Sequence, residues 1–215
     1  MAYSANFNAI IDGIKAVEGG YVNNPADSGG ATNFGIAFNY NKDALAKIGI
    51  TRPEQMKQMT WSQAKEIYYN VYWKVLWDDL PLAWADIIFN FFINAGANAI
   101  RALQLGLVAA GRDIDVDGGY GKLTQQAIFQ TDQNKGMGYF RYFMQNFYTT
   151  LATRNPSQKV FLNGWIKRIT NTGQILTPSN LELARTDAAI SKKKYKQFIC
   201  QQQGADKPQW KCGDP

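Results

Sequence analysis

Apolar residues recur at three- and four-residue steps along most of this chain, a spacing typical of helices that pack through one face. The pattern covers residues 5–18, 81–94, 97–110, 122–133, 137–153, 156–169 and 179–203. The first segment stops at Gly19-Gly20, because glycine disfavours continuation of a helix. No two segments alternate convincingly as paired strands, although a short hairpin fits residues 20–40. We therefore expect a fold that is mainly α.

Two capping boxes predict further helix starts. The segment Thr51-Arg52-Pro53-Glu54 combines a threonine cap with proline at the first helical position. The segment Thr60-Trp61-Ser62-Gln63 has the same spacing, closed by glutamine. We expect this second box to open a helix that runs toward Trp73.

The absence of histidine excludes several kinds of active site. None of the 215 residues is histidine, so neither a Ser–His nor a Cys–His pair can activate a nucleophile. Zinc amidase and HExxH peptidase sites are excluded for the same reason. Carboxylate chemistry on sugars remains open, because a glycosidase needs only an acid and a second polar group around a water.

Composition favours a globular protein with an anionic partner. Hydrophobic residues make up 46% of the chain and charged residues 19%, which suits one moderate domain or two small ones. The net charge of +6 would attract nucleic acid, anionic lipid or a wall polymer. No nucleic-acid motif accompanies the charge, so we expect no nucleic-acid partner.

The start of the chain does not resemble a signal peptide. Residues 1–4 lack a basic region, and the first apolar residues are amphipathic rather than continuous. The longest apolar stretch, residues 85–100, is interrupted by polar residues before it reaches membrane-spanning length. We expect synthesis in the cytoplasm, followed by release through some other agent.

Residues 17–36 carry the residues best suited to catalysis. Glu18 ends the first helix, Asp27 lies nine positions later in a loop rich in glycine and asparagine, and Thr32 follows after five more. Catalytic groups are often found on such loops. A glutamate at a helix C-terminus is disfavoured by about 0.3–1 kcal/mol, and neighbouring apolar surface would raise its pKa, as a general acid requires. The alternative is that none of the three is catalytic: Glu18 would be a surface charge at the helix end, Asp27 a turn residue that bonds its own backbone, and Thr32 an ordinary loop residue.

This segment resembles two groups of cell-wall enzymes. The order Glu18, Asp27, Thr32 is similar to the Glu…Asp…Thr arrangement of small phage lysozymes, with the second gap one residue shorter. Glu-Gly-Gly-Tyr followed by Asn-x-Pro-x-Asp-x-Gly-Gly-x-Thr-Asn-x-Gly-Ile resembles the glycoside hydrolase family 108 muramidases, which are endolysin-type enzymes that cut peptidoglycan. The resemblance implies that Glu18 is the catalytic acid. Asp27 would hold a water or stabilise positive charge at the anomeric carbon, Thr32 would direct its hydroxyl at the attacking water, and Tyr21 and Asn33 would bind substrate.

Four later motifs extend the resemblance over residues 5–170. Residues 68–73 look like the family's Tyr-x-x-x-Tyr-Trp helix, and residues 90–96 its Asp-x-x-x-Asn-x-Gly helix end, with Asn90 in place of the aspartate. Residues 117–124 and 161–168 are similar to the turn and the closing Gly-Trp-x-x-Arg of a peptidoglycan-binding region. Ser28 replaces the usual proline, and Ala31 replaces a frequent glutamate, which leaves Asp27 as the only nearby carboxylate for a second role.

The resemblance implies a lysozyme-like helical catalytic domain followed by a helical peptidoglycan-binding region. We expect the muramidase domain to span residues 1–95 and the peptidoglycan-binding region residues 96–175. A basic C-terminal helix and tail would occupy residues 176–215.

Asp86, Asn90 and Asn94 form a polar stripe on an otherwise apolar helix. Their four-residue spacing puts them on one side. Because so apolar a helix should be buried nearly all round, the stripe must be internally hydrogen-bonded or must face a polar cleft. One alternative is a structural network, and the other is that Asn94 and Asn90 bind sugar near Glu18.

Three features near the C-terminal half have competing interpretations. Asp113, Asp115 and Asp117 imitate the start of a calcium loop, but the twelfth position is Thr124 rather than glutamate, so we expect a tight turn and no metal. Cys200 and Cys212 are either inert thiols or a disulfide formed outside the cytoplasm. Four lysines near the C-terminus either form a solvated helix face or attract the protein to the anionic envelope: Lys192, Lys193, Lys194 and Lys196.

Together with the resemblance, the sequence predicts a monomeric peptidoglycan hydrolase without a cofactor. It would cleave the β-1,4 bond between N-acetylmuramic acid and N-acetylglucosamine, with inversion slightly favoured, as an endolysin in host cell lysis. The alternatives are a non-catalytic wall-binding protein and a chitinase-like glycosidase.

Overall fold

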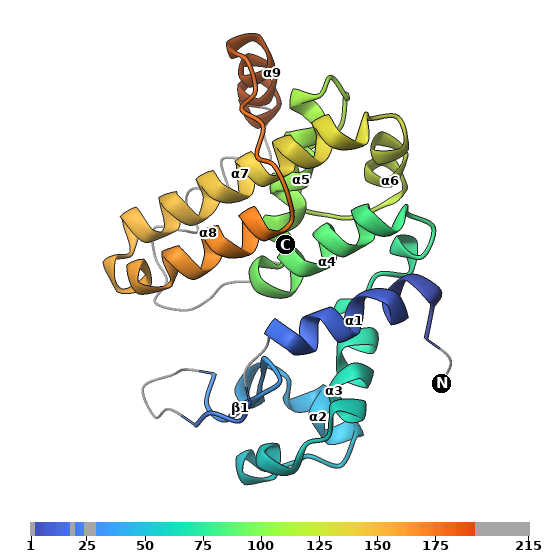
Figure 1. The fold of residues 1–215 in the computed structure, drawn as a ribbon, viewed down its shortest axis with the longest axis vertical. Helices are drawn as coiled ribbons and strands as arrows, with labels where there is room; N and C mark the ends of the chain where they lie inside the picture. The colour runs from blue at the N-terminus through green and yellow to red at the C-terminus, as the bar shows by residue number, and fades with distance from the viewer. Residues whose placement is uncertain (1–2, 18–19, 24–28, 192–215) are drawn as a thin grey trace. The chain divides into compact units, whose positions relative to one another are not determined.

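The computed structural model describes residues 3–17, 20–23 and 29–191, and most of them are helical, as predicted (Figure 1). The chain forms two compact units, Met1–Asp79 and Leu80–Pro215. This division lies before the apolar helix that the sequence analysis assigned to the first domain. The boundaries after residues 95 and 175 stay predictions.

The first unit is built on α1 (Ala5–Val17), the helix predicted from the first apolar pattern. Phe7, Ile10, Ile11 and Ile14 are all buried on one face of α1. The amide of Asn6 donates hydrogen bonds to the carbonyls of Trp77 and Asp78, at 3.0 and 3.3 Å, so both ends of this unit's chain are held together. The unit also contains α2 (Lys42–Lys47), α3 (Trp61–Ile67), a π-helical turn (Tyr68–Tyr72) and 3₁₀ turns at Phe38–Tyr40, Pro53–Gln58 and Val75–Trp77.

The capping box at Thr60 is confirmed, and the one predicted at Thr51 starts one residue later. Thr60 accepts a hydrogen bond from the Gln63 backbone at 3.3 Å and opens α3. The predicted box at Thr51 is wrong, because the 3₁₀ turn is closed by Gln55 instead of Glu54. The Gln55 side-chain carbonyl accepts from the backbone N–H groups of Thr51 and Arg52, at 2.8 and 2.9 Å. The cap is Arg52 rather than Thr51, so Gln55 holds the third position of the turn and its side chain satisfies both amides at the start.

A short hairpin lies within residues 20–40. Strands β1 (Thr32–Asn33) and β2 (Ile36–Ala37) pair antiparallel, and Val22 adds a bridge to Thr32 through two backbone hydrogen bonds of 2.8 Å. The two turn residues, Phe34 and Gly35, have φ angles of 48° and 72°. Positive φ at both positions matches the right-handed twist of the strands.

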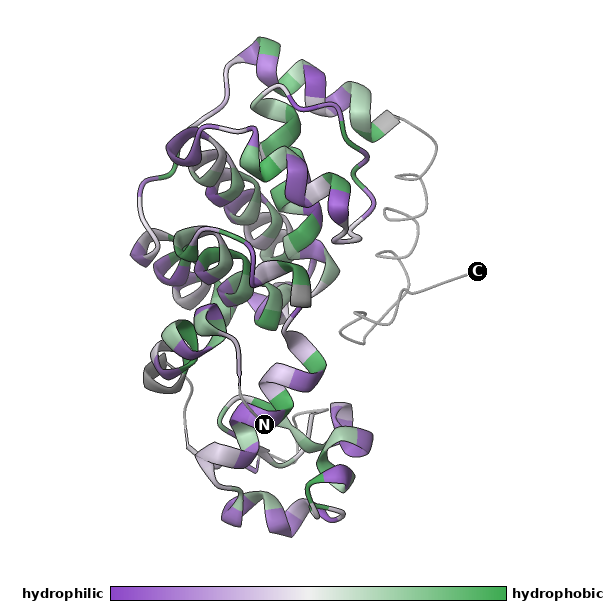
Figure 2. Ribbon diagram, turned by 90° about the vertical axis from the view of Figure 1, so that its right-hand side faces the viewer, coloured by the Kyte–Doolittle hydropathy of each residue, from purple (hydrophilic) through white to green (hydrophobic). Residues whose placement is uncertain are grey.

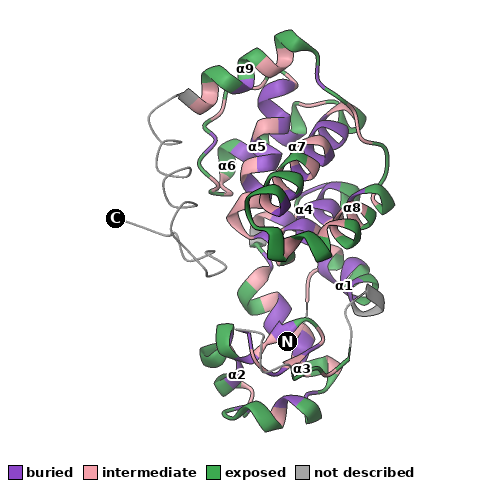
Figure 3. Ribbon diagram, turned by 90° about the vertical axis from the view of Figure 1, so that its left-hand side faces the viewer, coloured by how far each residue is buried: buried purple, intermediate pink, exposed green. Residues whose placement is uncertain are grey.

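The second unit is a helical bundle in which α7 and α8 run side by side (Figure 1). The described helices are α4 (Leu82–Ala95), α5 (Ala97–Ala109), α6 (Lys122–Phe129), α7 (Gln133–Arg154), α8 (Leu162–Asn171) and α9 (Asn180–Ser191). Helix α5 lies inside the bundle, and most of its residues are buried (Figure 3). Apolar and polar residues share each outer helix, as expected of helices with one packed face (Figure 2).

Three helix ends in this unit differ from the sequence pattern, and the first is the end of α6, at Phe129 instead of residue 133. Helix α7 starts at Gln133 because the Asp132 carboxylate caps it, accepting from the Lys135 backbone at 2.8 Å. Helix α8 starts at Leu162, since Pro156–Phe161 forms a 3₁₀ turn. None of the helices within the described residues is long and apolar enough to cross a membrane.

Helices α5 and α7 approach each other closely at Gly106. A Cβ atom at this position would lie 2.8 Å from the backbone nitrogen of Phe140 and 3.2 Å from the Tyr139 carbonyl carbon. Backbone atoms cannot move aside as a flexible side chain can. Only glycine therefore permits this separation of the two helices.

Helix α9 is fixed to α7 through Glu182. Its carboxylate lies 2.7 Å from Lys135 Nζ and accepts hydrogen bonds from the Tyr139 hydroxyl at 2.7 Å and the Ser179 backbone at 2.8 Å. The hydrogen bonds, that from Lys135 first, lower the pKa of Glu182 from 4.5 to about 2. Burial and the same carboxylate raise the pKa of Tyr139 to about 12.

Gly106→Ala is expected to destabilise the second unit, because the added methyl group meets backbone atoms of α7. Overpacking of this kind costs about 1–3 kcal/mol, measured as the free energy of unfolding in denaturant. Gly164→Ala is the matched control, since Gly164 lies in α8 and a Cβ atom added there would meet nothing within 4 Å. That change should stabilise by about 0.5–1 kcal/mol. Equal effects of the two substitutions would contradict the close approach.

The Glu182 contacts are expected to weaken in acid. Because the pKa of Glu182 is lower in the folded state than its ordinary 4.5, its contribution is complete above that value and is lost as pH falls toward about 2. The melting temperature of Glu182→Gln should therefore lie below that of the parent at pH 6 and approach it near pH 2. Glu54→Gln, at an exposed position, serves as the control. A difference for Glu182→Gln that stays constant over this pH range would refute the assignment.

Candidate active site

Two of the three predicted catalytic residues, Glu18 and Asp27, lie outside the described residues. The third, Thr32, is half-buried in β1, where its backbone pairs with Val22 and Ala37. Its hydroxyl donates a hydrogen bond to the Gly30 carbonyl at 3.1 Å. The proton of Thr32 is thus engaged within the loop, and its oxygen retains acceptor capacity for a water.

The two substrate-binding residues predicted near Thr32 differ in their surroundings. Tyr21 is half-buried, whereas Asn33 is buried. The Asn33 amide donates to the Met56 carbonyl at 2.8 Å, a contact that ties β1 to the 3₁₀ turn at Pro53–Gln58. This contact gives Asn33 an anchoring role, and binding of substrate by either residue stays a prediction.

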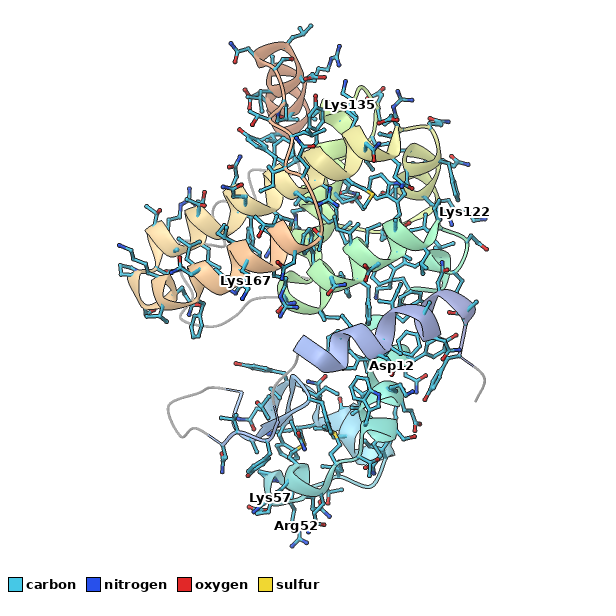
Figure 4. All side chains as sticks on the ribbon, viewed as in Figure 1. Asp12, Arg52, Lys57, Lys122, Lys135 and Lys167 are labelled. Atoms are coloured by element: carbon cyan, nitrogen blue, oxygen red, sulfur yellow. The ribbon has the colours of Figure 1, made fainter. Side chains whose placement is uncertain are left out.

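The hairpin turn is held in a strained conformation by an aromatic neighbour. Phe34 is the one described non-glycine residue with positive φ, a conformation that costs about 1–2 kcal/mol. Its carbonyl accepts a hydrogen bond from the Tyr68 hydroxyl at 2.8 Å, and its ring lies 5.5 Å from that of Trp61. Trp61 in turn donates to Asp12 at 3.2 Å, and Asp12 lies on α1 (Figure 4). These contacts position the hairpin that carries Thr32 against α1 and α3.

In α4 the polar stripe is internally hydrogen-bonded, one of the two outcomes that the sequence allowed. The Asn90 amide donates to the Asp86 carboxylate at 2.7 Å and to the Asp86 carbonyl at 3.1 Å. The Asn94 amide donates to the Asn90 carbonyl at 3.0 Å, and Asn94 is exposed. The amide hydrogens of Asn90 are therefore engaged within the helix, while Asn94 keeps an accessible carbonyl oxygen.

Asp86 is a titratable group that the sequence analysis placed in the polar stripe without assigning it a role of its own. Its side chain is half-buried, and burial raises its pKa above the ordinary value of 3.8, although the hydrogen bond from Asn90 opposes this shift. Carboxyl groups with raised pKa are enriched at functional sites. The four-residue spacing to Asn90 within an apolar helix allowed the hydrogen bond between the two side chains but did not predict the raised pKa.

The turn of residues 117–124 is organised around a buried glutamine. Gln104 accepts from the Gly118 backbone at 2.8 Å, and its amide donates to the Asp117 carboxylate at 2.9 Å and the Gly119 carbonyl at 3.0 Å. Asp117 also accepts from the Gly119 backbone at 2.8 Å. The carboxylate is thus used within a tight turn, as predicted. Within the part of the chain that is described, no three acidic, cysteine or histidine side chains gather as a metal site would require.

The residues singled out in the C-terminal tail lie outside the described residues. They are the lysines at positions 192, 193, 194 and 196 and both cysteines, Cys200 and Cys212. Envelope attraction by the lysines and a disulfide between the cysteines stay predictions.

Comparison with known families identifies two consecutive segments. Residues 11–96 match Glycosyl hydrolase 108, and residues 98–170 match a Predicted Peptidoglycan domain. The resemblance found in the sequence is thereby confirmed. The hydrolase match includes both the Glu18 loop and α4, although α4 packs in the second compact unit.

A solved structure agrees with these matches. The structure of Brucella abortus SagA is similar over 87% of this chain and 97% of its own, with a TM-score of 0.63 and 25% sequence identity. No curated protein matches the sequence. The chain is therefore similar to glycosyl hydrolase 108 over residues 11–96 and to a peptidoglycan domain over residues 98–170, and it is a glycoside hydrolase that acts on peptidoglycan.

Proposed function

We propose that this protein is an N-acetylmuramidase that cleaves the β-1,4 bond between N-acetylmuramic acid and N-acetylglucosamine. The observation that carries the proposal is the Glu18–Ile36 motif within the Glycosyl hydrolase 108 match. The lack of histidine supports it, since carboxylate chemistry is the route that remains open to a wall hydrolase.

Glu18 acts as the general acid in this reaction. It donates its proton to the glycosidic oxygen as the bond to the anomeric carbon breaks, and a water attacks that carbon. Thr32 accepts a hydrogen bond from this water, a role supported by the engagement of its own proton with Gly30. The proton of the water passes to Asp27, or to solvent if Asp27 instead stabilises positive charge on the sugar. We favour inversion, in which the water attacks from the face opposite the leaving group.

Helix α4 contributes contacts to the sugar. Asn94 is exposed and keeps a free carbonyl oxygen, which suits the N–H of an N-acetyl group. Asn90 holds the Asp86 carboxylate with its amide and has its own oxygen left for a sugar hydroxyl. The match of residues 11–96 to one hydrolase family includes α4.

In the cell, we propose that the enzyme serves as an endolysin. It needs no cofactor, acts as a monomer, and reaches the wall after release from the cytoplasm. The basic C-terminal lysines, including Lys192 and Lys196, would add attraction to the anionic envelope. This attraction should weaken with salt, as exposed charge interactions do.

Glu18→Gln is expected to abolish hydrolysis while leaving the fold intact, because the amide keeps the shape but has no proton to give. General acid catalysis supplies roughly 10²–10⁴-fold. The measurement is the release of new reducing ends from purified peptidoglycan, with circular dichroism to check folding. Retention of more than about a tenth of parental turnover would refute the role of Glu18.

The same assay separates the alternative functions. A parental protein that binds peptidoglycan and releases no reducing ends would be a wall-binding protein without turnover. Faster cleavage of chitin oligomers than of peptidoglycan would indicate a chitinase-like enzyme.

Asn94→Ala is expected to lower turnover at least about tenfold, the effect of losing a hydrogen bond to bound sugar, with little change in melting temperature. Its exposed position predicts the small structural cost. Asn90→Ala is the comparison, because it removes the partner of a half-buried carboxylate and should lower the melting temperature. A large loss of stability in Asn94→Ala, with unchanged activity per folded molecule, would return the stripe to a purely structural role.

A further inference from the structure

The turn between α7 and α8 exposes two adjacent apolar residues. Val160 is 77% exposed and Phe161 is 53% exposed, and both belong to the 3₁₀ turn Pro156–Phe161. This turn lies at the end of the α7–α8 hairpin away from α6 (Figure 1). We call residues 154–168 the hairpin tip.

Phe161 is supported from within the hairpin by stacked rings. Its ring lies 5.9 Å from that of Trp165, and Trp165 stacks on the buried Tyr148 at 4.8 Å with an interplanar angle of 19°. One face of the indole is therefore covered by Tyr148. This series of contacts anchors Phe161 to α7 and α8 and leaves half of its surface in solvent.

The hairpin tip also lies in a long stretch of the chain whose charged residues are all positive. Residues 133–181 contain six cations and no carboxylate. Lys135 pairs with Glu182, and Arg141 is buried against the segment of Thr172 and Gln174. The four remaining cations all belong to the hairpin tip: Arg154, Lys159, Lys167 and Arg168.

Two of these cations are available to an anionic surface. Lys159 and Lys167 are exposed, and neither forms an ion pair with any residue that the structure describes. Lys167 projects from α8 (Figure 4). Exposed apolar residues bordered by lysine are the combination that enters the headgroup region of a bilayer, where apolar groups enter the acyl boundary and cations meet phosphate.

We propose that the hairpin tip binds an anionic phospholipid surface, with Val160 and Phe161 inserted and Lys159 and Lys167 on the phosphates. A glycan partner is less well matched, because the aliphatic Val160 has no ring to stack on a sugar and the Trp165 indole is partly covered. The proposal does not depend on hydrolytic activity.

The test is sedimentation of the full-length protein with phosphatidylcholine vesicles that contain or lack phosphatidylglycerol. Val160→Ser/Phe161→Ser should weaken binding to the anionic vesicles about tenfold or more, because it removes the two apolar side chains that insert into the bilayer. Val160→Ser alone, at the more exposed position, should give a smaller loss without affecting folding. Lys159→Gln/Lys167→Gln should reduce binding mainly at low salt.

Helix α6 provides a matched control in the same unit. Leu123 and Phe129 are 73% and 55% exposed, but the surrounding residues 113–132 contain four aspartates and one lysine. Leu123→Ser/Phe129→Ser should therefore leave vesicle binding unchanged. Hydrolysis of small soluble muropeptides should be the same in all variants, which separates this test from that of the proposed function.

Three outcomes would overturn the proposal. The first is that the parent does not bind anionic vesicles, and the second is that the tip and α6 variants lose binding equally. The third is that the tip variants bind vesicles normally but lose affinity for isolated peptidoglycan, which would make the hairpin tip a glycan site.

Discussion

The close approach of α5 and α7 at Gly106 determines how the second unit is assembled. Backbone atoms of Tyr139 and Phe140 occupy the space that a side chain at position 106 would need. At this separation the ring of Phe140 meets Phe91 of α4 at 5.1 Å, edge to face. Gly136 of α7 similarly leaves room for Trp84 of α4, whose ring atoms lie 3.0 Å from the position of an added Cβ. Two glycines thus allow three helices to share one dense core.

The rotation of α4 follows from this packing. With Trp84, Ile88 and Phe91 buried, the opposite side of the helix carries Asp86 and Asn90 half-buried and Asn94 exposed. The amide of Asn90 then satisfies the carboxylate of Asp86, which a half-buried charge requires. Apolar contacts on the far side of α4 therefore determine the direction in which the polar stripe faces, and the accessible end of the stripe is Asn94.

Periodicity predicted the helices well because one apolar face is enough to define each of them. It missed the early start of α7, since Gly136 and Gly138 interrupt the apolar pattern even though both are buried against neighbours. The strands of the hairpin have two residues each, too few for alternation to be visible. The sequence correctly predicted that a side chain would cap the turn after Thr51. That side chain belongs to Gln55 rather than Glu54.

Side-chain roles were harder to predict than helices, because they depend on contacts distant in sequence. Asn33 was selected by its motif, yet its amide is used by the Met56 carbonyl, 23 residues away. The raised pKa of Asp86 depends on burial that only the assembled bundle provides. Thr32 differs from both, since its hydroxyl donates to the Gly30 carbonyl only two residues away, and this local bond leaves the hydroxyl oxygen as the available acceptor.

Helix α4 connects the two family segments structurally. By sequence α4 belongs to the hydrolase match, which ends at residue 96, but its buried residues pack against α5 and α7 of the peptidoglycan domain. Burying a Phe or Leu-sized side chain contributes about 1.5–3 kcal/mol. With Trp84, Ile87, Ile88, Phe89 and Phe91 all buried, α4 without its partners would expose a large apolar surface. The helix that carries Asp86, Asn90 and Asn94 is therefore stabilised by the binding domain, so the hydrolase depends on that domain for part of its own structure.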